Sequence, residues 1–501
     1  MKKSLFATLV CLFSIIILQA QDNKLVWGNS SKQILNISYT YNSAYDREAN
    51  FLGTDSQTKH TFWYNKSEPY DPSLRADKKF SLTRMDSANN VVFSKDLQLM
   101  AFPESSDSVT TLIHDIVFFN NKLVLLLEIC NTKKNISAIY LHELNLDGNL
   151  TGKDSKIGEV KSRFVNNKLT LSPDQSSLLV SSSSIEPQTA KPYYLLQVFD
   201  KNLSIIHNKK LYSSTQNSRM LFDAFSLEIY MDNTHRIFFL LQNYFSKIDR
   251  QTTFVFYYNP SSDQLKEFIP DTGGNTLIYA SVICLNQPDK ISLYGFCINE
   301  GSKDLQLTGS FSMLLDVETG FTNLRKKEAL LGIGCAFPII NCITKNDGGV
   351  ILQYENADIS QDITGAFKNE VSIVSYNASG EILYQVVLNK SQHCYYGTCG
   401  YCCLYDPVKD KLFVIFIDWD THAQTNDKIR KILYSDKKSG IPVLVSIDAF
   451  GSITKKPLLN TIDPAVMICP LLTTQCAPDA LLIWGFEKDD YYRLGKLTIT
   501  E

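Results

Sequence analysis

The sequence lacks the motifs of the familiar enzyme classes and has no excess of either charge. It has 49 Lys and Arg residues against 52 Asp and Glu residues, a net charge of −3, so it lacks the dense basic surface that displaces counterions from nucleic acid. It contains no GxSxG, HExxH or GxxxxGK(S/T) motif and no EF-hand loop. These absences remove the usual signatures of serine hydrolases, zinc proteases, P-loop nucleotide sites and calcium loops.

Long apolar runs are scarce, and the one at the start predicts export. Lys2 and Lys3 precede an apolar run from Leu5 to Leu18, and Ala20 offers a small residue for cleavage. This pattern is typical of a secretory signal peptide, because the run is shorter than the roughly 20 residues that span a bilayer. We expect a signal peptide at 1–20 and a single domain at 21–501, exported to the periplasm or the cell exterior without a transmembrane anchor.

Two series of turn signals repeat about every 60 residues, a period typical of repeat folds. In the first series an apolar residue precedes Asp or Asn, a short polar turn and another apolar residue. This series is found at Asp86, Asp147, Asp200, Asn259, Asp316, Asn377 and Asp448. In the second series a polar turn precedes a run of β-branched and aromatic residues, at Asn121, Gln175, Asn233, Lys290, Asp347, Asp410 and Asp479. Four short strands per period predict a radial β architecture, because one such sheet cannot bury both of its faces alone.

The two ends of the chain predict how this ring closes. The last unit has three expected strands, around Met467, Leu482 and Leu497. The segment at 22–26 matches the turn and strand at 200–203, so it can supply the missing fourth strand and leave no unpaired main edge. We therefore predict an all-β fold, a β-propeller of eight blades with four antiparallel strands each. Seven blades are the alternative if residues 30–80 do not form a full blade.

The period and strand pattern resemble those of bacterial exported β-propellers of the WD-repeat-like and TolB-like kind, over nearly the whole mature chain. The Gly-His and Trp-Asp dipeptides of WD40 repeats do not recur here, and the period is longer. The resemblance therefore implies an exported propeller without a particular ligand or activity. A pair of β-sandwiches also has closely spaced strands, but the two matched turn series argue against that fold.

Candidate binding residues gather on one face of the expected ring. In a propeller, the loops between second and third strands and between blades share a face, and here the longest of these segments are 64–79 and 418–442. Loops held by a rigid scaffold are where binding residues concentrate. Four expected second strands end in an acid at matching register: Glu128, Glu355, Asp418 and Glu487. Such carboxylates, if they converge, could hold a cation, bind a basic or polyhydroxylated ligand or form an acid/base pair; they are equally common at ordinary polar strand ends.

The densest group of candidates begins at Asp418. There Trp419 lies between two acids, an arrangement that suits stacking against a sugar, although an exposed loop with a half-buried Trp is the alternative. Of the seven histidines, His114, His393 and His422 map toward the variable face and are the acid–base candidates. We predict ligand contact at Asp418, Trp419, Asp420, His422, Glu355, Glu128, Glu487, His393, Trp63 and Tyr64.

The cysteines favour a structural role. Eleven remain after the signal peptide, an odd number, so they cannot all pair within the chain. Cys399 and Cys402 form a CxxC near His393, which would suit zinc. However, Cys335, Cys399 and Cys469 fall at one point of three successive innermost strands, with Cys342 and Cys476 seven positions further on. That register predicts small, buried, reduced thiols, with disulfides and a metal site as alternatives. We expect no metal and no cofactor.

Two functions fit this sequence. The first is an exported, non-catalytic binding or scaffold protein that engages a protein, peptide or glycan through its long-loop face. The alternative is a carbohydrate-active hydrolase or lyase that uses carboxylates at the channel mouth and a histidine, since propellers host both kinds of function. Carboxylates about 5 to 9.5 Å apart in an open pocket with aromatic walls would favour the enzyme. The sequence gives no indication of the oligomeric state.

Overall fold

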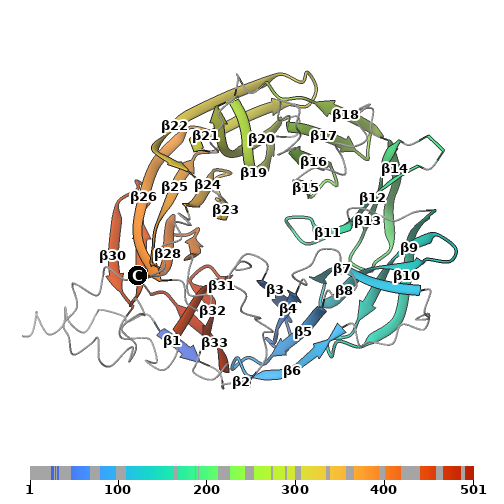
Figure 1. Cartoon of the computed structure of the whole chain (residues 1–501), viewed down its shortest axis with the longest axis horizontal. Helices are drawn as coiled ribbons and strands as arrows, with labels where there is room; N and C mark the ends of the chain where they lie inside the picture. Colours follow the sequence, from blue (N-terminus) through green and yellow to red (C-terminus); the bar gives the residue numbers. More distant parts are fainter. Residues whose placement is uncertain are drawn as a thin grey trace, which may run out of the picture.

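A ring of small antiparallel sheets is the architecture of the computed structural model (Figure 1). The structure describes residues 24–27, 29, 31–32, 47–67, 79–97, 109–161, 167–186, 188–189, 191–212, 226–242, 253–271, 273, 275–287, 290–299, 306–334, 339–356, 366–393, 401–418, 441–458, 467–486 and 491–500. Within these ranges the chain forms strands β1 to β33 and has no helix long and apolar enough to cross a membrane.

The first four blades follow each other in chain order. Blade one consists of β3 (Arg47–Thr54), β4 (Thr61–Ser67), β5 (Lys79–Met85) and β6 (Val91–Asp96). Blade two consists of β7 (Val109–Phe119), β8 (Lys122–Asn131), β9 (Ile136–Leu144) and β10 (Leu150–Val160). Blade three consists of β11 (Asn167–Leu171), β12 (Leu178–Ile185), β13 (Pro192–Phe199) and β14 (Ile205–Tyr212). Blade four consists of β15 (Ser226–Met231), β16 (Ile237–Gln242), β17 (Thr253–Asn259) and β18 (Gln264–Phe268).

The next three blades repeat the same order of strands. Blade five consists of β19 (Asn275–Gln287), β20 (Lys290–Asn299), β21 (Gln306–Asp316) and β22 (Thr322–Gly334). Blade six consists of β23 (Ile339–Thr344), β24 (Val350–Asn356), β25 (Ala366–Tyr376) and β26 (Ile382–His393). Blade seven consists of β27 (Tyr401–Asp406), β28 (Lys411–Asp418), β29 (Ile441–Ile447) and β30 (Ile453–Pro457).

Blade eight joins both ends of the described chain. It consists of β31 (Met467–Ala477), β32 (Ala480–Phe486) and β33 (Tyr491–Thr498), completed by β1 (Lys24–Trp27) and β2 (Ser31–Lys32). Leu25 pairs with Leu497 in an antiparallel register, and Ser31 pairs with Tyr492 further along the same edge. The prediction of eight blades closed by the N-terminal strand is confirmed, and the seven-blade and sandwich alternatives are wrong.

The apolar core lies between neighbouring blades, which explains the burial of the second strands. In β8 every residue from Leu123 to Glu128 is buried, because both faces of the strand meet another blade. Outer strands such as β30 are mostly exposed. One core cluster combines Phe119 and Leu126 of blade two with Val180 and Phe199 of blade three. A single sheet therefore has no core of its own, as expected for a radial repeat.

The turn between the third and fourth strands has a polar residue as its hydrogen-bond acceptor. Oδ1 of Asp448 accepts hydrogen bonds from the backbone N–H groups of Phe450 at 2.9 Å and Ser452 at 2.8 Å, an Asx turn. In blade two this acceptor is Asn145, two residues before Asp147, the residue that the sequence pattern placed in the turn series. The reason is position: the acceptor is the last residue of the third strand or the next one, and β9 ends at Leu144.

Each of these turns also contacts the preceding blade. Arg84 of blade one donates to the Asp147 carboxylate at 2.8 Å and to the Leu146 carbonyl at 3.2 Å. Lys266 of blade four donates to the Val317 carbonyl at 3.0 Å. The repeated turn signal therefore has a double role: it reverses the chain within one blade and holds that blade to its neighbour.

Candidate functional site

Three of the four predicted carboxylates are described, and all three are buried. Glu128 lies in β8, Glu355 in β24 and Asp418 at the end of β28, so each occupies the second strand of its blade as predicted. Each residue is only about 1% exposed. A buried carboxylate needs a cation or hydrogen-bond donors, and the structure provides these partners in two separate places.

The first group surrounds Glu128 at the seam between blades two and three. Nε2 of His114 lies 2.8 Å from Glu128 Oε2, and Ser137 donates its hydroxyl to Glu128 Oε1. His114 lies at a register shift between Ile113 and Asp115, a β-bulge in the innermost strand β7. Across the seam, Nδ2 of Asn167 lies 3.0 Å from His114 Nε2. Bulges redirect side chains, and here the bulge accompanies a partly exposed imidazole in contact with a buried carboxylate.

The second group is a network of four charges at the seam between blades six and seven. Lys390 of β26 forms an ion pair with Glu355, and Lys455 of β30 forms one with Asp418. Burial lowers the pKa of Lys390, whereas the charges of Glu355 and Asp418 oppose that change. The two pairs therefore belong to one electrostatic network with balanced charge, in which Asp418 interacts with lysines of two blades.

The three acids do not form one cluster. Blade two, with Glu128, lies on the opposite side of the ring from β24 and β28, with Glu355 and Asp418 (Figure 1). The predicted register is thus present, but it places the acids around the ring and not around one point. Their expected role in ligand contact stays a prediction, and their observed contacts are within the protein.

Trp63 and Tyr64 lie in β4 of blade one. The Trp63 ring is buried and forms an edge-to-face contact with Trp484 of blade eight, with 5.5 Å between ring centroids. Its Nε1 donates to Thr61 Oγ1 at 3.1 Å. Tyr64 is partly buried beside the core cluster that includes Phe62. The structure therefore gives Trp63 a packing role at the seam that closes the ring.

The remaining predicted site residues are beyond what the structure describes. Trp419, Asp420, His422 and Glu487 lie outside the described residues, and for His393 only the backbone position at the end of β26 is given. Ligand contact by these residues stays a prediction.

Six cysteines with described side chains are thiols outside any disulfide: Cys130, Cys297, Cys342, Cys402, Cys403 and Cys476. Burial raises the pKa of Cys402 to about 12, so this thiol is inert at neutral pH. Cys342 and Cys476 lie in the innermost strands β23 and β31, as predicted. Cys335 and Cys399 lie outside the described residues, and within the described ranges no three His, Cys, Asp or Glu side chains group as metal ligands.

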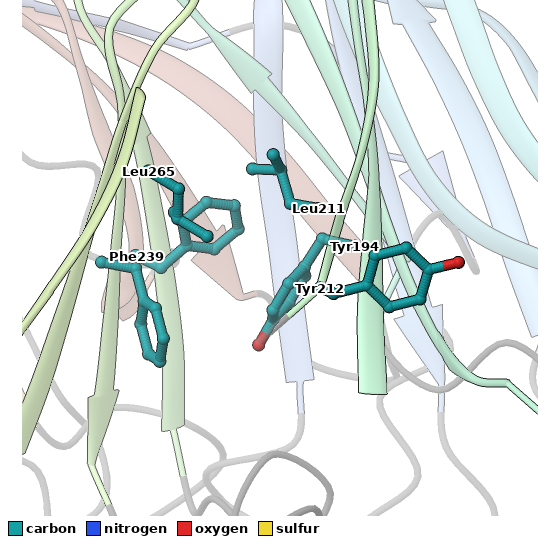
Figure 2. Close-up of a pocket in the computed structure, with 6 residues that line it drawn as sticks. Tyr194, Leu211, Tyr212, Phe239 and Leu265 are labelled. Carbon is teal, nitrogen blue, oxygen red and sulfur yellow. The ribbon is translucent and has the colours of Figure 1, made fainter. Parts of the chain in front are cut away.

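A small apolar cavity lies between blades three and four. Figure 2 shows Phe239 and Leu265 on one sheet facing Tyr194 and Leu211 on the next, whereas the ring of Tyr212, at the edge of the cavity, points to the other side of its sheet. Its volume is about 10 Å³, close to the minimum that holds one water. We interpret this cavity as imperfect packing at the seam, because no ligand of useful size fits it.

Sequence reasoning missed one polar and aromatic group, at the end of blade three. There Lys210 contacts the rings of Tyr193 and Tyr212 and the carboxylate of Glu186. The available signal was the alternation in β14, since Lys210 and Tyr212 are two residues apart and share one face of the strand.

The chain matches no protein-family model and no curated protein sequence. Among solved structures it is similar to the WD40 domain of SCAP from fission yeast, with 9% identity, a TM-score of 0.41 and coverage of 94% of this chain and 98% of that one. It is also similar to the polysaccharide lyase Uly1 (8% identity, TM-score 0.38, coverage 81% and 95%). A third similar structure is the β-propeller domain of the Trilobed protease from Pyrococcus furiosus (10% identity, TM-score 0.32, coverage 83% and 98%). Likeness at this distance assigns neither a subfamily nor an activity. The described strands themselves establish the architecture: the chain is an eight-bladed β-propeller.

Proposed function

We propose that this chain is a non-catalytic binding or scaffold propeller, exported from a bacterial cell, that engages a protein, peptide or glycan through one face. The observation that supports this proposal is the difference between the two ends of the strands. At one end, third and fourth strands are joined by Asx turns that are fixed to the neighbouring blade. At the other end, the connections differ widely in length, from 132–135 in blade two to 419–440 in blade seven. Loops that vary in length while a rigid scaffold holds their ends are where binding residues concentrate.

The buried carboxylates support a binding role over catalysis. Glu355 and Asp418 are each neutralised by a lysine and shielded from solvent. A glycosidase needs two carboxyl groups that flank one substrate bond. Glu128 lies across the ring from the other two acids, and Glu355 and Asp418 share one network of ion pairs with Lys390 and Lys455. Their contacts fit residues that hold blades together at the base of the loops.

The test compares Trp419, the residue that follows β28 in the sequence, with Phe450, in the turn between β29 and β30. Trp419→Ala alters the predicted site, and Phe450→Ala alters a turn residue that is 86% exposed on the other face. Both variants, with the unaltered protein, are applied to arrays of defined glycans and defined peptides. If Trp419 is a stacking anchor, its replacement should weaken binding to the selected probe by about 1 to 3 kcal/mol, whereas Phe450→Ala should leave binding unchanged. Loss of binding in Phe450→Ala alone would place the ligand on the short-turn face and contradict the proposal.

One observation favours the alternative of a carbohydrate-active hydrolase or lyase. His114 is partly exposed at a bulge and is oriented by a buried carboxylate, which is the arrangement of a general base. Incubation with defined polysaccharides tests it, with new reducing ends and new unsaturated ends as readouts. Turnover that His114→Ala abolishes would establish the enzyme and overturn the non-catalytic role.

A further inference from the structure

Two tyrosines and a glutamate surround an ammonium group at the end of blade three. Nζ of Lys210 lies 3.9 Å from the ring centroid of Tyr193 and 4.9 Å from that of Tyr212. Oε1 of Glu186 lies 3.2 Å from the same nitrogen. The two ring centroids are 6.0 Å apart and the rings are inclined by 54°. A cation within about 6 Å of an aromatic face is attracted by the ring quadrupole, so this group has the composition of a cation cage.

The walls of the cage are held in place without the lysine. Tyr193 and Tyr212 are direct partners in the pairing of β13 with β14, which places both side chains on one face of the sheet. Tyr212 donates its hydroxyl to Glu186 Oε1 at 2.9 Å, and Thr189 donates to Glu186 Oε2 at 2.9 Å. The hydrogen bond from Tyr212 is the main reason that the pKa of Glu186 is lowered. The carboxylate is therefore ionised and oriented by neighbours other than Lys210.

The cage is fixed on one side and open on the other. Tyr193 is 5% exposed and belongs to the core between blades two and three. Tyr212 is 42% exposed, and the side chain of Lys210 is 38% exposed. An ion pair of such exposure contributes only about 0 to 1 kcal/mol. A competing ammonium from outside the chain would therefore displace a weakly held group.

We propose that Glu186, Tyr193 and Tyr212 form a binding site for a primary ammonium group, such as a lysine side chain of a partner, and that Lys210 occupies this site when no ligand is bound. The site lies where β12 and β14 end, on the variable face, and it does not depend on the segment at 418–442. A primary ammonium is the matching class because the resident nitrogen is within hydrogen-bonding distance of Glu186. A quaternary ammonium can contact the rings but has no proton to donate to the carboxylate.

The test removes the ammonium group of Lys210 by substitution and supplies a primary ammonium on a small probe molecule. In the full chain, Lys210→Met keeps much of the side-chain bulk and loses the charge. The probes are Nα-acetyl-lysine methylamide and tetramethylammonium, titrated by calorimetry and by ligand-observed NMR. We expect Lys210→Met to bind the lysine probe with a Kd of roughly 1 mM, and the unaltered protein to bind it about tenfold more weakly, because the tethered lysine competes at high effective concentration. Tetramethylammonium should bind more weakly than the lysine probe.

A neighbouring lysine provides the matched control. Lys209 precedes Lys210 in β14, forms an ion pair with Asp263 and faces the other side of the sheet. Lys209→Met should bind the lysine probe no better than the unaltered protein, and Tyr212→Leu combined with Lys210→Met should abolish binding.

Equal weak binding by Lys210→Met and Lys209→Met, with unchanged thermal unfolding, would overturn the proposal. If Lys210→Met fails to fold, Lys210→Gln provides the same comparison. Trp419→Ala should leave this binding unaltered, so that failure of the cation site and failure of the proposed function are separable.

Discussion

The side-chain hydroxyl of Ser312, in blade five, donates a hydrogen bond of 2.6 Å to the backbone carbonyl of Gly380, in the outer turn of blade six. Gly380 has a φ of +80°, the left-handed region that glycine tolerates best. A Cβ atom at this position would lie 2.9 Å from Ser312 Oγ. The hydrogen bond from Ser312 therefore couples the conformation of the turn at Gly380 to the packing of blade five against blade six.

This relationship predicts different effects for two glycine substitutions. Gly152 has a similar φ of +76°, but a Cβ there would meet nothing within 4 Å. Gly152→Ala should cost the left-handed conformation alone, about 1 kcal/mol, whereas Gly380→Ala should cost more because it also displaces Ser312. Free energies of unfolding from urea titrations measure both. Equal losses would show that the seam absorbs the added methyl group.

The acidic turns predict a dependence of stability on pH. The hydrogen bond from the Ser452 N–H is the main cause that lowers the pKa of Asp448 below 3.8, and that from the Thr319 N–H does the same for Asp316. A carboxylate with a lowered pKa in the folded state contributes stability above its ordinary pKa, and this contribution is lost as the pH falls through the lowered value. We therefore expect stability to decrease below about pH 4.

Asn tests this origin, because Asn377 accepts two turn hydrogen bonds in blade six from the same relative positions as Asp448 does in blade seven. Asp316→Asn combined with Asp448→Asn should leave the urea midpoint at pH 7 nearly unchanged and reduce the loss between pH 5 and pH 3. An unchanged pH profile would locate the acid sensitivity elsewhere in the chain.

The charge network between blades six and seven predicts strong coupling between its members. Lys390→Met leaves the buried carboxylates of Glu355 and Asp418 short of one cation, and removal of one partner of a buried pair costs about 3 to 5 kcal/mol. Lys390→Met combined with Glu355→Gln should cost less than Lys390→Met alone. Chemical denaturation of the four proteins of this cycle gives the coupling energy, and additive losses would show that the pair is not coupled.

The described thiols predict the result of counting reactive thiols in the denatured and the native protein. Six cysteines with described side chains form no disulfide, so thiol counting on denatured, unreduced protein should find at least these six. In the native protein the reaction should be slow, because burial raises the pKa of Cys402 and Cys403 and suppresses their thiolates. A count below six would show that some of these cysteines oxidise in the isolated protein.

Ring closure predicts the effect of an N-terminal deletion. Removal of residues 22–32 deletes β1 and β2 and leaves the outer edge of β33 unpaired. It also removes Trp27, which packs against Gly495. We expect a large loss of thermal stability and a tendency to aggregate through the open edge, measured by calorimetry and light scattering. A deletion variant as stable and monodisperse as the unaltered protein would show that seven blades and a three-stranded eighth hold the ring alone.

The sequence predicted the architecture well because turn chemistry and strand alternation are local properties. In blade two it placed the turn series at Asp147, two residues after the acceptor Asn145, since both polar residues follow the third strand. The sequence alone could not predict that Glu355 and Asp418 are buried. Their lysine partners lie 35 and 37 residues away on fourth strands, so the pairing depends on how neighbouring strands and blades stack. A strand that ends in an acid has the same local pattern whether that acid meets solvent or a buried lysine.

The junction of β1 with β33 also sets an order of assembly. Of the described strands β1 is synthesised first, yet its partner β33 is synthesised last. Blades one to seven have all their strands in sequence and can form as the chain lengthens, whereas blade eight cannot be completed before β31 to β33 are synthesised. Closing so long a loop carries an entropic cost, and non-local pairing of this kind slows folding. A chain that terminates before β33 would therefore leave the edges of β1 unpaired. Such an exposed strand edge can pair with other chains and promote aggregation.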